Sequence, residues 1–445
     1  MRKAPLPFSK QVTYAFGMMG WSIMINLISV ILVYLYAPPI GSGFPLFITQ
    51  AVLFGLFNTI AIITASGRLI DAVCDPLIAQ FSDSSKNPKG RRTPFMKWAI
   101  IPSLVFCSLI FHPLHQYQSN VNVVWLALML VGFYISSTSY IIPYNALLPE
   151  LAHGSAEKVK LATWQSVGYV VGIGVASNAF NITGVLQHGL HLSSRLAALQ
   201  LTVALLSLFA AMCMAIAAFG IDEKKYSHSV PSAVPLKQAL KQTLSNRNFI
   251  YFIVADFSYF IAVTIITSGI LYFLSVLLQL PEAMGNKLMI TMVLVSFFFY
   301  PIVNYLSGRI GKKKIVIVSL LILSAVFAGI YFLGKVNMDP ATQIYLLIII
   351  AAIPVASLNI LPNAILSEII EEDSQQTGSK KEAIYFAVRY FFVKIAQTVG
   401  IALFAMFLIY GKDVHHDFGV RLNGILGFAL CVMAAIVFSR FKEKR

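Results

Sequence analysis

The sequence has very little charge for its length. Only 11% of its 445 residues are Asp, Glu, Lys or Arg, whereas 58% are hydrophobic and the mean hydropathy is +0.77. A water-soluble chain of this size could not keep so much apolar surface away from water. The composition therefore excludes a soluble globular protein and indicates an integral, multi-pass membrane protein.

Cysteines are few, and recognisable catalytic motifs are missing. Cys74, Cys107, Cys213 and Cys431 lie in apolar stretches at irregular spacing, which excludes a CxxC metal site or a disulfide framework and predicts small buried side chains. No Walker A, HExxH or GxSxG motif occurs, so nothing supports an ATP-driven pump or an intramembrane hydrolase. We expect no enzymatic activity, no catalytic residue, no cofactor and no metal beyond a transported cation.

Long apolar runs dominate what is present, and a bilayer crossing needs about 20 helical residues. Twelve candidate spans fall near residues 11–36, 47–81, 93–112, 121–149, 162–182, 196–220, 248–279, 284–307, 313–333, 342–368, 383–410 and 421–440. The first is too long for the apolar core of a cleavable signal peptide. A polar segment divides the spans, so we predict two six-helix bundles, residues 1–220 and 248–445, joined by a cytoplasmic linker at 221–247.

The basic residues are distributed unevenly over the loops. With both termini inside, 25 of the 33 Lys and Arg residues fall in cytoplasmic segments and five fall in outer loops. This bias predicts cytoplasmic N and C termini. It also explains the net charge of +15 without any interaction with nucleic acid, because no aromatic-basic stripe is present.

The two halves repeat one another at an offset of 218 to 220 residues. IIPYNALLPEL (141–151) matches ILPNAILSEII (360–370), and KGRRTP (89–94) matches SGRIGKKK (307–314). Such repeats about an axis along the membrane normal occur in major-facilitator transporters. We assign the charged residues at these cytoplasmic ends to a gate: Asp83, Arg91, Arg92, Glu150, Arg309 and Glu368.

Three charged residues interrupt the second span, in GRLIDAVCDP (67–76). Arg68, Asp71 and Asp75 are spaced i, i+3, i+7 and share one helix face. A charge at the bilayer centre costs about 2.5–3.5 kcal/mol on insertion scales, so this face must point into the bundle. Arg68 and Asp71 could form a structural ion pair, but Asp75 would then have no countercharge nearby in the sequence. Alternatively, the two carboxylates bind a monovalent cation or share a raised proton affinity.

The eleventh span carries two further basic residues, in FAVRYFFVKIAQTVG (386–400). Lys394 lies near its middle, where a cavity-facing role is favoured over snorkelling to the interface. A charge there could neutralise the carboxylates of the second span when their cation leaves. Arg389 suits either the interface or the interior, and Asp256 of the seventh span suits either a cavity or an ion pair.

Uncharged polar residues within the spans are candidates for a substrate cavity. They are Ser22, Asn26, Tyr140, Tyr144, Asn145, Gln165, Asn359 and Gln397. Taken singly, each fits hydrogen bonding between neighbouring helices better than contact with a substrate.

These motifs resemble those of the glycoside-pentoside-hexuronide:cation symporters, the melibiose-permease group of the major facilitator superfamily. The similarity rests on GRLIDAVCDPLIAQFSDSS…KGRRTPF, YAFG (14–17), IPYNALLPEL and FVKIAQTVG, and it runs along nearly the whole chain. The resemblance implies the major-facilitator fold. It also implies a cation site at Asp71 and Asp75, with Thr138 as a hydroxyl ligand and with Lys394 and Arg68 in the adjoining charge network.

The sequence departs from this family where galactosides are bound. Galactoside-transporting members carry acids where this chain has Ser22 and Ile141, and a tryptophan at the position of Asn145. Cys74 stands where cation-binding members often have an amide, so Na⁺ and H⁺ both remain open. Lysophospholipid symporters of the same superfamily share the paired acids and the lysine but lack the sugar ligands.

The sequence therefore predicts a monomeric, cation-coupled symporter that works by alternating access, in the inner membrane if the source is bacterial. The expected partner is a small organic solute, with a glycoside or uronide favoured and a lysolipid as the alternative. Proton-driven efflux and a non-transporting receptor remain alternatives of other classes.

Overall fold

The computed structural model describes residues 6–36, 38, 44–49, 52–53, 57–152, 154–192, 194–226, 234–281, 284–378, 381–411 and 413–443. Within these ranges, twelve helices contain 18 or more residues. They are α1 (Phe8–Tyr36), α2 (Thr59–Ser84), α3 (Thr93–Ile110), α4 (Asn120–Leu151), α5 (Ser155–Ser177), α7 (Arg195–Gly220), α10 (Arg247–Tyr272), α11 (Met284–Ile310), α12 (Lys312–Phe332), α13 (Pro340–Thr377), α14 (Glu382–Phe407) and α15 (Phe418–Ser439). Each predicted span falls on one of these helices.

Shorter elements join the long helices. They are β1 (Val52–Leu53), β2 (Phe57–Asn58), α6 (Ala179–Gly189), α8 (Glu223–Tyr226), α9 (Leu236–Ser245), the π-helical turn η1 (Phe273–Leu277) and the 3₁₀ turn η2 (Leu408–Tyr410). β1 and β2 pair antiparallel. The predicted span 47–81 therefore begins too early, because a short apolar run fits a strand as well as a helix. The predicted linker holds two short helices.

Not all of the long helices are apolar enough to cross a membrane by length and composition. Ten described helices pass that test, and an eleventh span arises if α5 and α6, bent by 45° at their junction, are counted together. The helix left out is α2, whose centre carries Arg68, Asp71 and Asp75. Its charge marks it as the helix that most needs polar surroundings inside the protein.

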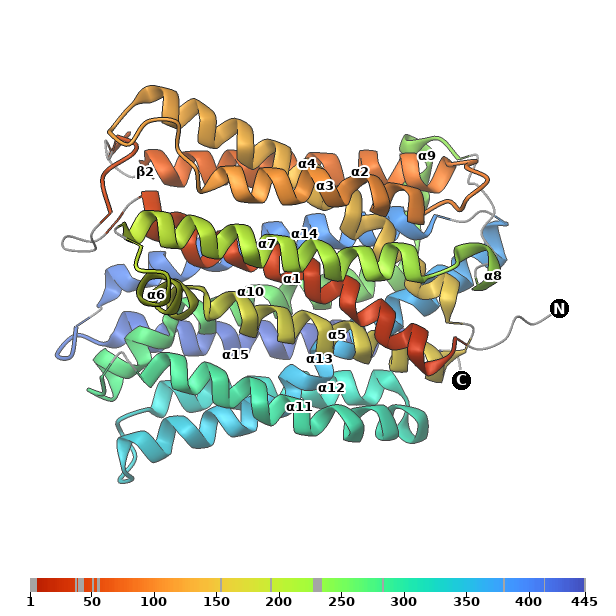
Figure 1. Ribbon diagram of the computed structural model, residues 1–445. Helices are drawn as coiled ribbons and strands as arrows, with labels where there is room; N and C mark the ends of the chain where they lie inside the picture. Colours follow the sequence, from red (N-terminus) through yellow and green to blue (C-terminus); the bar gives the residue numbers. More distant parts are fainter. Residues whose placement is uncertain are drawn as a thin grey trace. The chain divides into compact units, whose positions relative to one another are not determined.

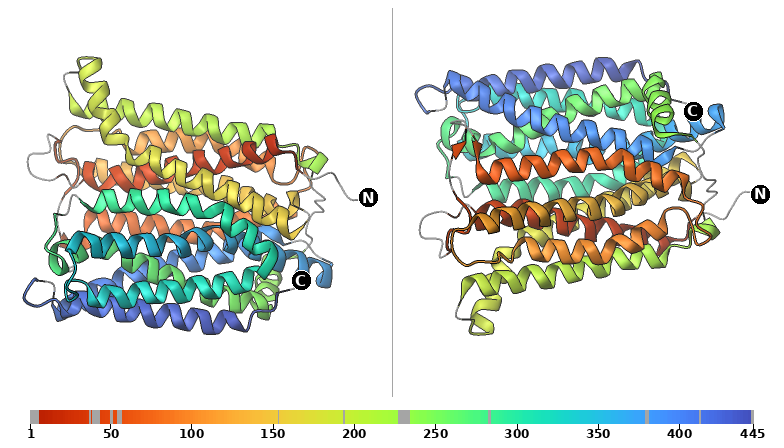
Figure 2. Two further views of the ribbon diagram at one scale, coloured as in Figure 1. Left: turned by 90° about the horizontal axis from the view of Figure 1, so that it is seen from below. Right: turned by 90° about the horizontal axis from the view of Figure 1, so that it is seen from above.

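The chain divides into two compact units. Unit 1 contains residues 1–153, 164–236 and 379–387, and unit 2 contains residues 154–163, 237–378 and 388–445. In unit 1, α1 packs on α7, α2 and α3 pack on α4, and α3 packs on α7. Unit 2 repeats this scheme, because α10 packs on α15, α11 and α12 on α13, and α12 on α15. Within each unit the long helices run alongside one another, with their connections at the helix ends (Figure 1, Figure 2).

Glycines allow the closest helix contacts within each unit. A Cβ atom on Gly168 of α5 would lie 2.2 Å from the carbonyl oxygen of Ala15 in α1, and one on Gly172 would lie 2.7 Å from that of Met19. In unit 2, a Cβ atom on Gly400 of α14 would lie 3.0 Å from the carbonyl oxygen of Ile261 in α10. Small residues allow such close backbone approach in membrane helices, and here they seat α5 and α14 on the first helix of each repeat.

Candidate functional site

The charged face of α2 is held against α4. Gly67 makes this contact possible, because a Cβ atom there would lie 2.8 Å from the ring of Tyr134. The following turns of α2 therefore lie close to α4, and Asp71 and Asp75 are buried in unit 1 with only 8% and 1% of their surface exposed. Helix spacing and the glycine together place two carboxylates inside the protein, as the i, i+4 pattern predicts.

Both carboxylates converge on one hydroxyl group of α4. Thr138 Oγ1 lies 2.5 Å from Asp71 Oδ1 and 3.4 Å from Asp75 Oδ1, and Thr138 is itself 2% exposed. A hydroxyl has a single hydrogen to donate, so it cannot form a full hydrogen bond with each carboxylate. The three side chains supply a set of oxygen atoms of the kind that hard cations prefer.

The site differs in chemistry from a transition-metal centre. Among the residues that the structure describes, no three His, Cys, Asp or Glu side chains lie together as metal ligands.

The side chain of Arg68 falls outside the described residues. Lys394 lies in α14 of unit 2 and is half-buried. The roles of both in a charge network with the α2 carboxylates stay predictions.

Most of the polar residues predicted to line a substrate cavity hold helices of unit 1 together. Ser22 donates to the carbonyl of Tyr169 at 2.7 Å, and Asn26 donates to the carbonyl of Ser22 at 2.8 Å. Tyr140 donates to the carbonyl of Met214 at 3.1 Å, and Tyr144 donates to that of Tyr14 at 2.7 Å. Gln165 of α5 donates to the Asn145 side chain of α4. Each of these bonds except that of Asn26, which lies within α1, thus connects two helices of unit 1.

The remaining two candidates lie in unit 2. Asn359 of α13 hydrogen-bonds Tyr300 of α11, and Gln397 of α14 is half-buried. Their assignment to a substrate cavity stays a prediction.

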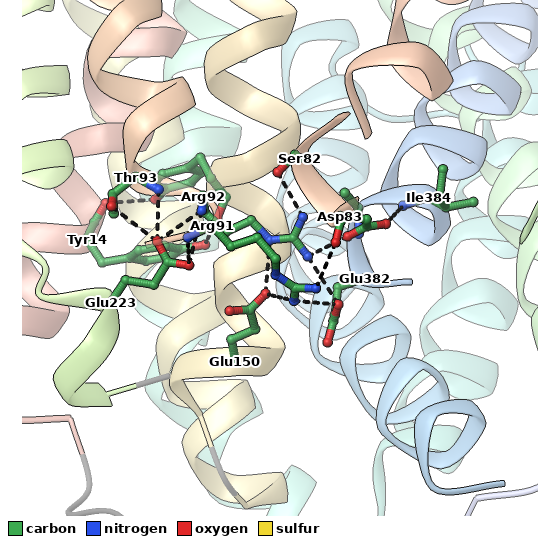
Figure 3. Close-up of polar contacts among 12 residues, drawn as sticks. Tyr14, Ser82, Asp83, Arg91, Arg92, Thr93, Glu150, Glu223, Glu382 and Ile384 are labelled. Carbon is green, nitrogen blue, oxygen red and sulfur yellow. Dashed lines mark hydrogen bonds and ion pairs between the residues drawn. The ribbon is translucent and has the colours of Figure 1, made fainter. Parts of the chain in front are cut away.

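A second polar site in unit 1 surrounds the two arginines that precede α3 (Figure 3). Arg91 Nη2 lies 2.6 Å from Glu150 Oε1, and Arg92 Nε lies 2.9 Å from the same oxygen. Arg92 Nη2 also lies 2.6 Å from Asp83 Oδ1. Burial lowers the pKa of Arg91, but the surrounding carboxylates raise it above its ordinary value, so the guanidinium stays charged. We call these residues, with Glu382, the arginine cluster.

The first turn of α14 completes the arginine cluster. Glu382 Oε2 lies 2.9 Å from Arg91 Nη2 and 3.1 Å from Arg92 Nη2, and its side chain is 5% exposed. In return, the Asp83 carboxylate accepts hydrogen bonds from the backbone N–H groups of Ala383 and Ile384, each at 3.3 Å. These N–H groups belong to a helix N-terminus, which favours a negative charge. Two independent sets of contacts therefore tie this turn into unit 1.

The linker after α7 supplies another carboxylate. Glu223 of α8 accepts hydrogen bonds from the backbone N–H groups of Arg91, at 2.7 Å, and of Arg92 and Thr93, at 3.0 Å. Gly90 has φ +125°, and a Cβ atom there would lie 2.4 Å from Glu223 Oε2. The glycine thus leaves room for Glu223 to cap the N-terminus of α3. The same contacts hold the backbone of Arg91 and Arg92, which directly follow Gly90.

Unit 2 contains a matching arrangement at the start of α12. Glu443 accepts from the backbone N–H groups of Lys312, at 2.7 Å, and Lys313, at 3.1 Å. Gly311 has φ +85°, and a Cβ atom there would lie 2.7 Å from Glu443 Oε2. Lys312 Nζ also lies 2.8 Å from Glu368 Oε1. A glycine and a distant carboxylate therefore frame the basic loop in each unit.

The first turn of α5 joins this second arrangement. Lys158 pairs with Glu371 of α13, and Ser155 Oγ accepts from Lys312 Nζ at 2.5 Å. Arg309, predicted to belong to the gate, instead has its guanidinium 4.5 Å from the ring centre of Tyr305 and is exposed. The basic residue that pairs with Glu368 is Lys312, and a role of Arg309 in the gate stays a prediction.

Sequence reasoning missed several members of these clusters. They are Lys158, Glu223, Lys312, Glu382 and Glu443. A signal existed for two of them, because IDEKK (221–225) and FKEKR (441–445) repeat at an offset of 220 residues, as the two loops do. No comparable signal marks Glu382, whose arginine partners lie about 290 residues earlier in the chain.

A buried ion pair also lies inside unit 2. Arg389 Nε lies 2.7 Å from Asp256 Oδ2, its Nη2 lies 3.2 Å from Asp256 Oδ1, and its Nη1 donates to the Asn363 side chain. The ring of Phe252 lies 5.5 Å from the guanidinium. Of the alternatives left open for Asp256 and Arg389, the structure shows an interior ion pair that joins α10, α13 and α14.

Comparison with known proteins identifies the family. Residues 13–438 match the family described as MFS/sugar transport protein. The chain belongs to this family. As an MFS/sugar transport protein it is a secondary transporter of the membrane, and the match confirms the predicted resemblance to cation symporters of the major facilitator superfamily.

Two relatives of this chain are named for different solutes. The isoprimeverose transporter of Lactiplantibacillus pentosus is 22% identical, over 98% of this chain and 90% of its own length. The sodium-dependent lysophosphatidylcholine symporter 1 of Xenopus tropicalis is 23% identical, over 77% of this chain and 70% of its own length. Relatives at similar identity therefore carry very different solutes.

A solved structure supports the fold. The major-facilitator proton:xylose symporter XylE, bound to 6-bromo-6-deoxy-D-glucose, superposes with a TM-score of 0.65 over 98% of this chain and 95% of its own, at 14% sequence identity. At that identity the likeness concerns the fold alone. It confirms the predicted major-facilitator architecture.

Proposed function

We propose that this transporter is a cation-coupled symporter whose cation binds at Asp71, Asp75 and Thr138. The observation that carries the proposal is the convergence of two buried carboxylates on one hydroxyl. Two ionised carboxylates this close to one hydroxyl group are subject to electrostatic repulsion. Entry of Na⁺ or of one proton relieves it, so the site favours occupancy by a positive charge.

The proposed solute is a glycoside, pentoside or uronide. Support comes from the family and from the isoprimeverose transporter, which matches nearly the whole chain. The two acids of galactoside-transporting members are replaced by Ser22, whose hydroxyl is engaged with α5, and by Ile141, which is buried. We therefore expect poor transport of melibiose-like galactosides. A lysolipid is the second candidate, favoured by the similarity to the lysophosphatidylcholine symporter.

Coupling would proceed by alternating access. Cation binding neutralises the α2 carboxylates, and its release leaves charge that Lys394 and Arg68 are proposed to balance. The arginine cluster is proposed as the cytoplasmic gate of unit 1, because opening there requires the first turn of α14 to leave its partners on α2, α4 and the loop before α3. The lysine pairs of unit 2 are proposed to act in the same way.

The test is transport in liposomes that contain the purified protein. Uptake of a panel of pentosides, uronides, galactosides and lysophosphatidylcholine is measured under imposed sodium or proton gradients. We expect one gradient to drive uptake of one solute class, and Asp71→Asn and Asp75→Asn to abolish the accumulation. Asp222→Asn is the control, since Asp222 is an exposed carboxylate. Accumulation that survives both substitutions would contradict the assignment of the cation site.

Two variants of Thr138 test the hydroxyl separately. Thr138→Ser keeps the oxygen and should keep cation affinity near that of the wild type. Thr138→Val removes it at nearly the same volume and should lower cation affinity at least tenfold, because a hydrogen bond to a charged group contributes about 1.5–3 kcal/mol.

In the liposome assay, export of solute against the gradient would instead favour proton-driven efflux, and the absence of any flux would favour a receptor.

A further inference from the structure

The outer face of the α3–α4 pair in unit 1 carries a groove that transport does not explain. Its volume is about 660 Å³, within the range of roughly 300–1,000 Å³ typical of small-molecule sites. Its lining includes Ser85, Asn87, Pro94 and Trp98 toward one end and Phe106 and Gly132 toward the other. The groove therefore begins at the loop between α2 and α3 and follows both helices.

The dimensions of the groove match one leaflet of a bilayer. Pro94 and Phe106 of α3 are twelve residues apart, which corresponds to about 18 Å along a helix. Half of a hydrocarbon core of about 30 Å is about 15 Å. At the deep end Gly132 admits the ring of Phe106, whose edge would lie 2.7 Å from a Cβ atom at that position. The ring of Phe106 packs against Gly132 at this end, and the groove is long enough to take a chain of one leaflet's depth.

The deep part of the groove is effectively apolar. Ser136 and Ser139 line it, but their hydroxyls donate to backbone carbonyls of their own helix, those of Gly132 and Ile135, at 2.9 and 2.8 Å. Trp98 stands at the edge with 83% of its surface exposed, as tryptophans do at membrane interfaces. An acyl chain would meet only carbon atoms and satisfied hydroxyls along this path.

The shallow end of the groove is polar and positively charged. Ser85 and Asn87 line it, and the exposed Lys86 and Lys89 belong to the same loop. The nearest acid on this segment, Asp83, is buried and paired with an arginine, so it does not offset the lysines. Because the distribution of basic residues places this loop in the cytoplasm, the positive end faces the headgroups of the inner leaflet.

We propose that this groove binds an anionic phospholipid of the cytoplasmic leaflet. The lipid phosphate lies at Lys86 and Lys89, with Ser85 and Asn87 as polar neighbours, and one acyl chain lies between α3 and α4 beside Trp98. The pairing of a basic end with an apolar channel one leaflet long selects a lipid over a free anion. The site is independent of the proposed solute and of the coupling cation.

The test compares lipid binding to the purified, full-length protein by native mass spectrometry. Phosphatidylglycerol and phosphatidylcholine with identical acyl chains compete for the detergent-solubilised protein. We expect phosphatidylglycerol to be retained at least tenfold more strongly. The double variant Lys86→Gln/Lys89→Gln should weaken its retention roughly thirtyfold, because each basic residue near an anionic surface contributes about fivefold in affinity. Lys314→Gln, at an exposed lysine in the first turn of α12, should leave retention unchanged.

A second variant tests the channel without changing charge. Ser139→Phe should fill the groove and lower retention of phosphatidylglycerol at least fivefold, whereas Val171→Phe, at an exposed position of α5, should not. Equal retention of the two lipids by the wild-type protein would overturn the proposal before any variant is made. Unchanged retention in both the double-lysine variant and Ser139→Phe would overturn it as well.

Discussion

Replacing Glu382 by Gln tests whether the arginine cluster acts as a gate. Glu382 Oε2 accepts from Arg91 at 2.9 Å and from Arg92 at 3.1 Å, and the side chain is 5% exposed. Gln keeps the shape and one acceptor oxygen but removes the charge. Charged hydrogen bonds contribute about 1.5–3 kcal/mol and neutral ones about 0.5–1.5 kcal/mol. The loss is therefore about 1 kcal/mol for each of two bonds, or about 2 kcal/mol in all.

A loss of this size should raise the population of the opened cluster roughly thirtyfold, since 1.4 kcal/mol corresponds to a factor of ten. The assay is alkylation of a cysteine placed at Ala146, which is fully buried in α4 one turn before Glu150. A membrane-impermeant maleimide is added to the cytoplasmic side, in a background where Cys74 is alanine. Glu382→Gln should increase the rate of labelling about thirtyfold. The variant should still bind solute when no ion gradient is imposed.

Two comparisons make this result interpretable. Asp222→Asn removes an exposed charge near the same loop and should leave the labelling rate unchanged. Glu371→Gln removes the charge of a carboxylate that is 47% exposed and pairs with the buried Lys158 in unit 2. It should change the rate of labelling in unit 1 less than threefold, because solvent screens the Glu371 end of the pair. If Glu382→Gln labels at the wild-type rate although the protein is folded, the cluster does not limit opening.

Two further pairs of variants test the supporting contacts by thermal unfolding in detergent. Glu223→Gln and Gly90→Ala disturb the same cap of α3, so each should lower the free energy of unfolding by about 2 kcal/mol and the double variant should lose less than the sum; Gly378→Ala, at φ +67° with open space around it, should lose only about 1 kcal/mol. Asp256→Asn and Arg389→Gln should each lower the free energy of unfolding by about 3–5 kcal/mol, because each leaves the other charge buried without its partner. The double variant should lose less than the sum of the two single variants, because neither charge then remains. Full additivity in either pair would contradict the contact.

The sequence predicts the long helices well because a helix that crosses a bilayer needs an apolar run of about 20 residues, which few other structures contain. It also predicts a long helix at α2, because charges on one helix face identify an interior surface, although α2 is not among the described helices that are apolar enough to cross a membrane. The start of this span is predicted wrongly. Apolar residues near 52–58 fit either a strand or a helix, and only the pairing of β1 with β2 decides between them.

The candidate site is predictable only where local spacing determines it. The i, i+4 relation of Asp71 and Asp75 puts them on one face whatever surrounds the helix. Tyr140 and Tyr144 show the limit, because a polar side chain in a span gives no sign of whether it will meet solute or a neighbouring helix. Glu382 is harder still, since its arginines lie on a loop that only the folded chain brings near.

The two units share the same framing contacts but differ in how strongly they hold their basic loops. Each uses a glycine with positive φ and a distant carboxylate, Glu223 or Glu443, to cap the helix that follows. In unit 1 the capped loop presents two fully buried guanidiniums to three carboxylates, whereas in unit 2 it presents Lys312 to acids that keep more exposure to water. Because buried charges are costly to leave unpaired and exposed ones are not, separation of the unit 1 cluster should set the energy of opening. The same cap is present in both units, and on the proposed gating role we expect the cluster of unit 1 to resist opening more strongly than the lysine pairs of unit 2.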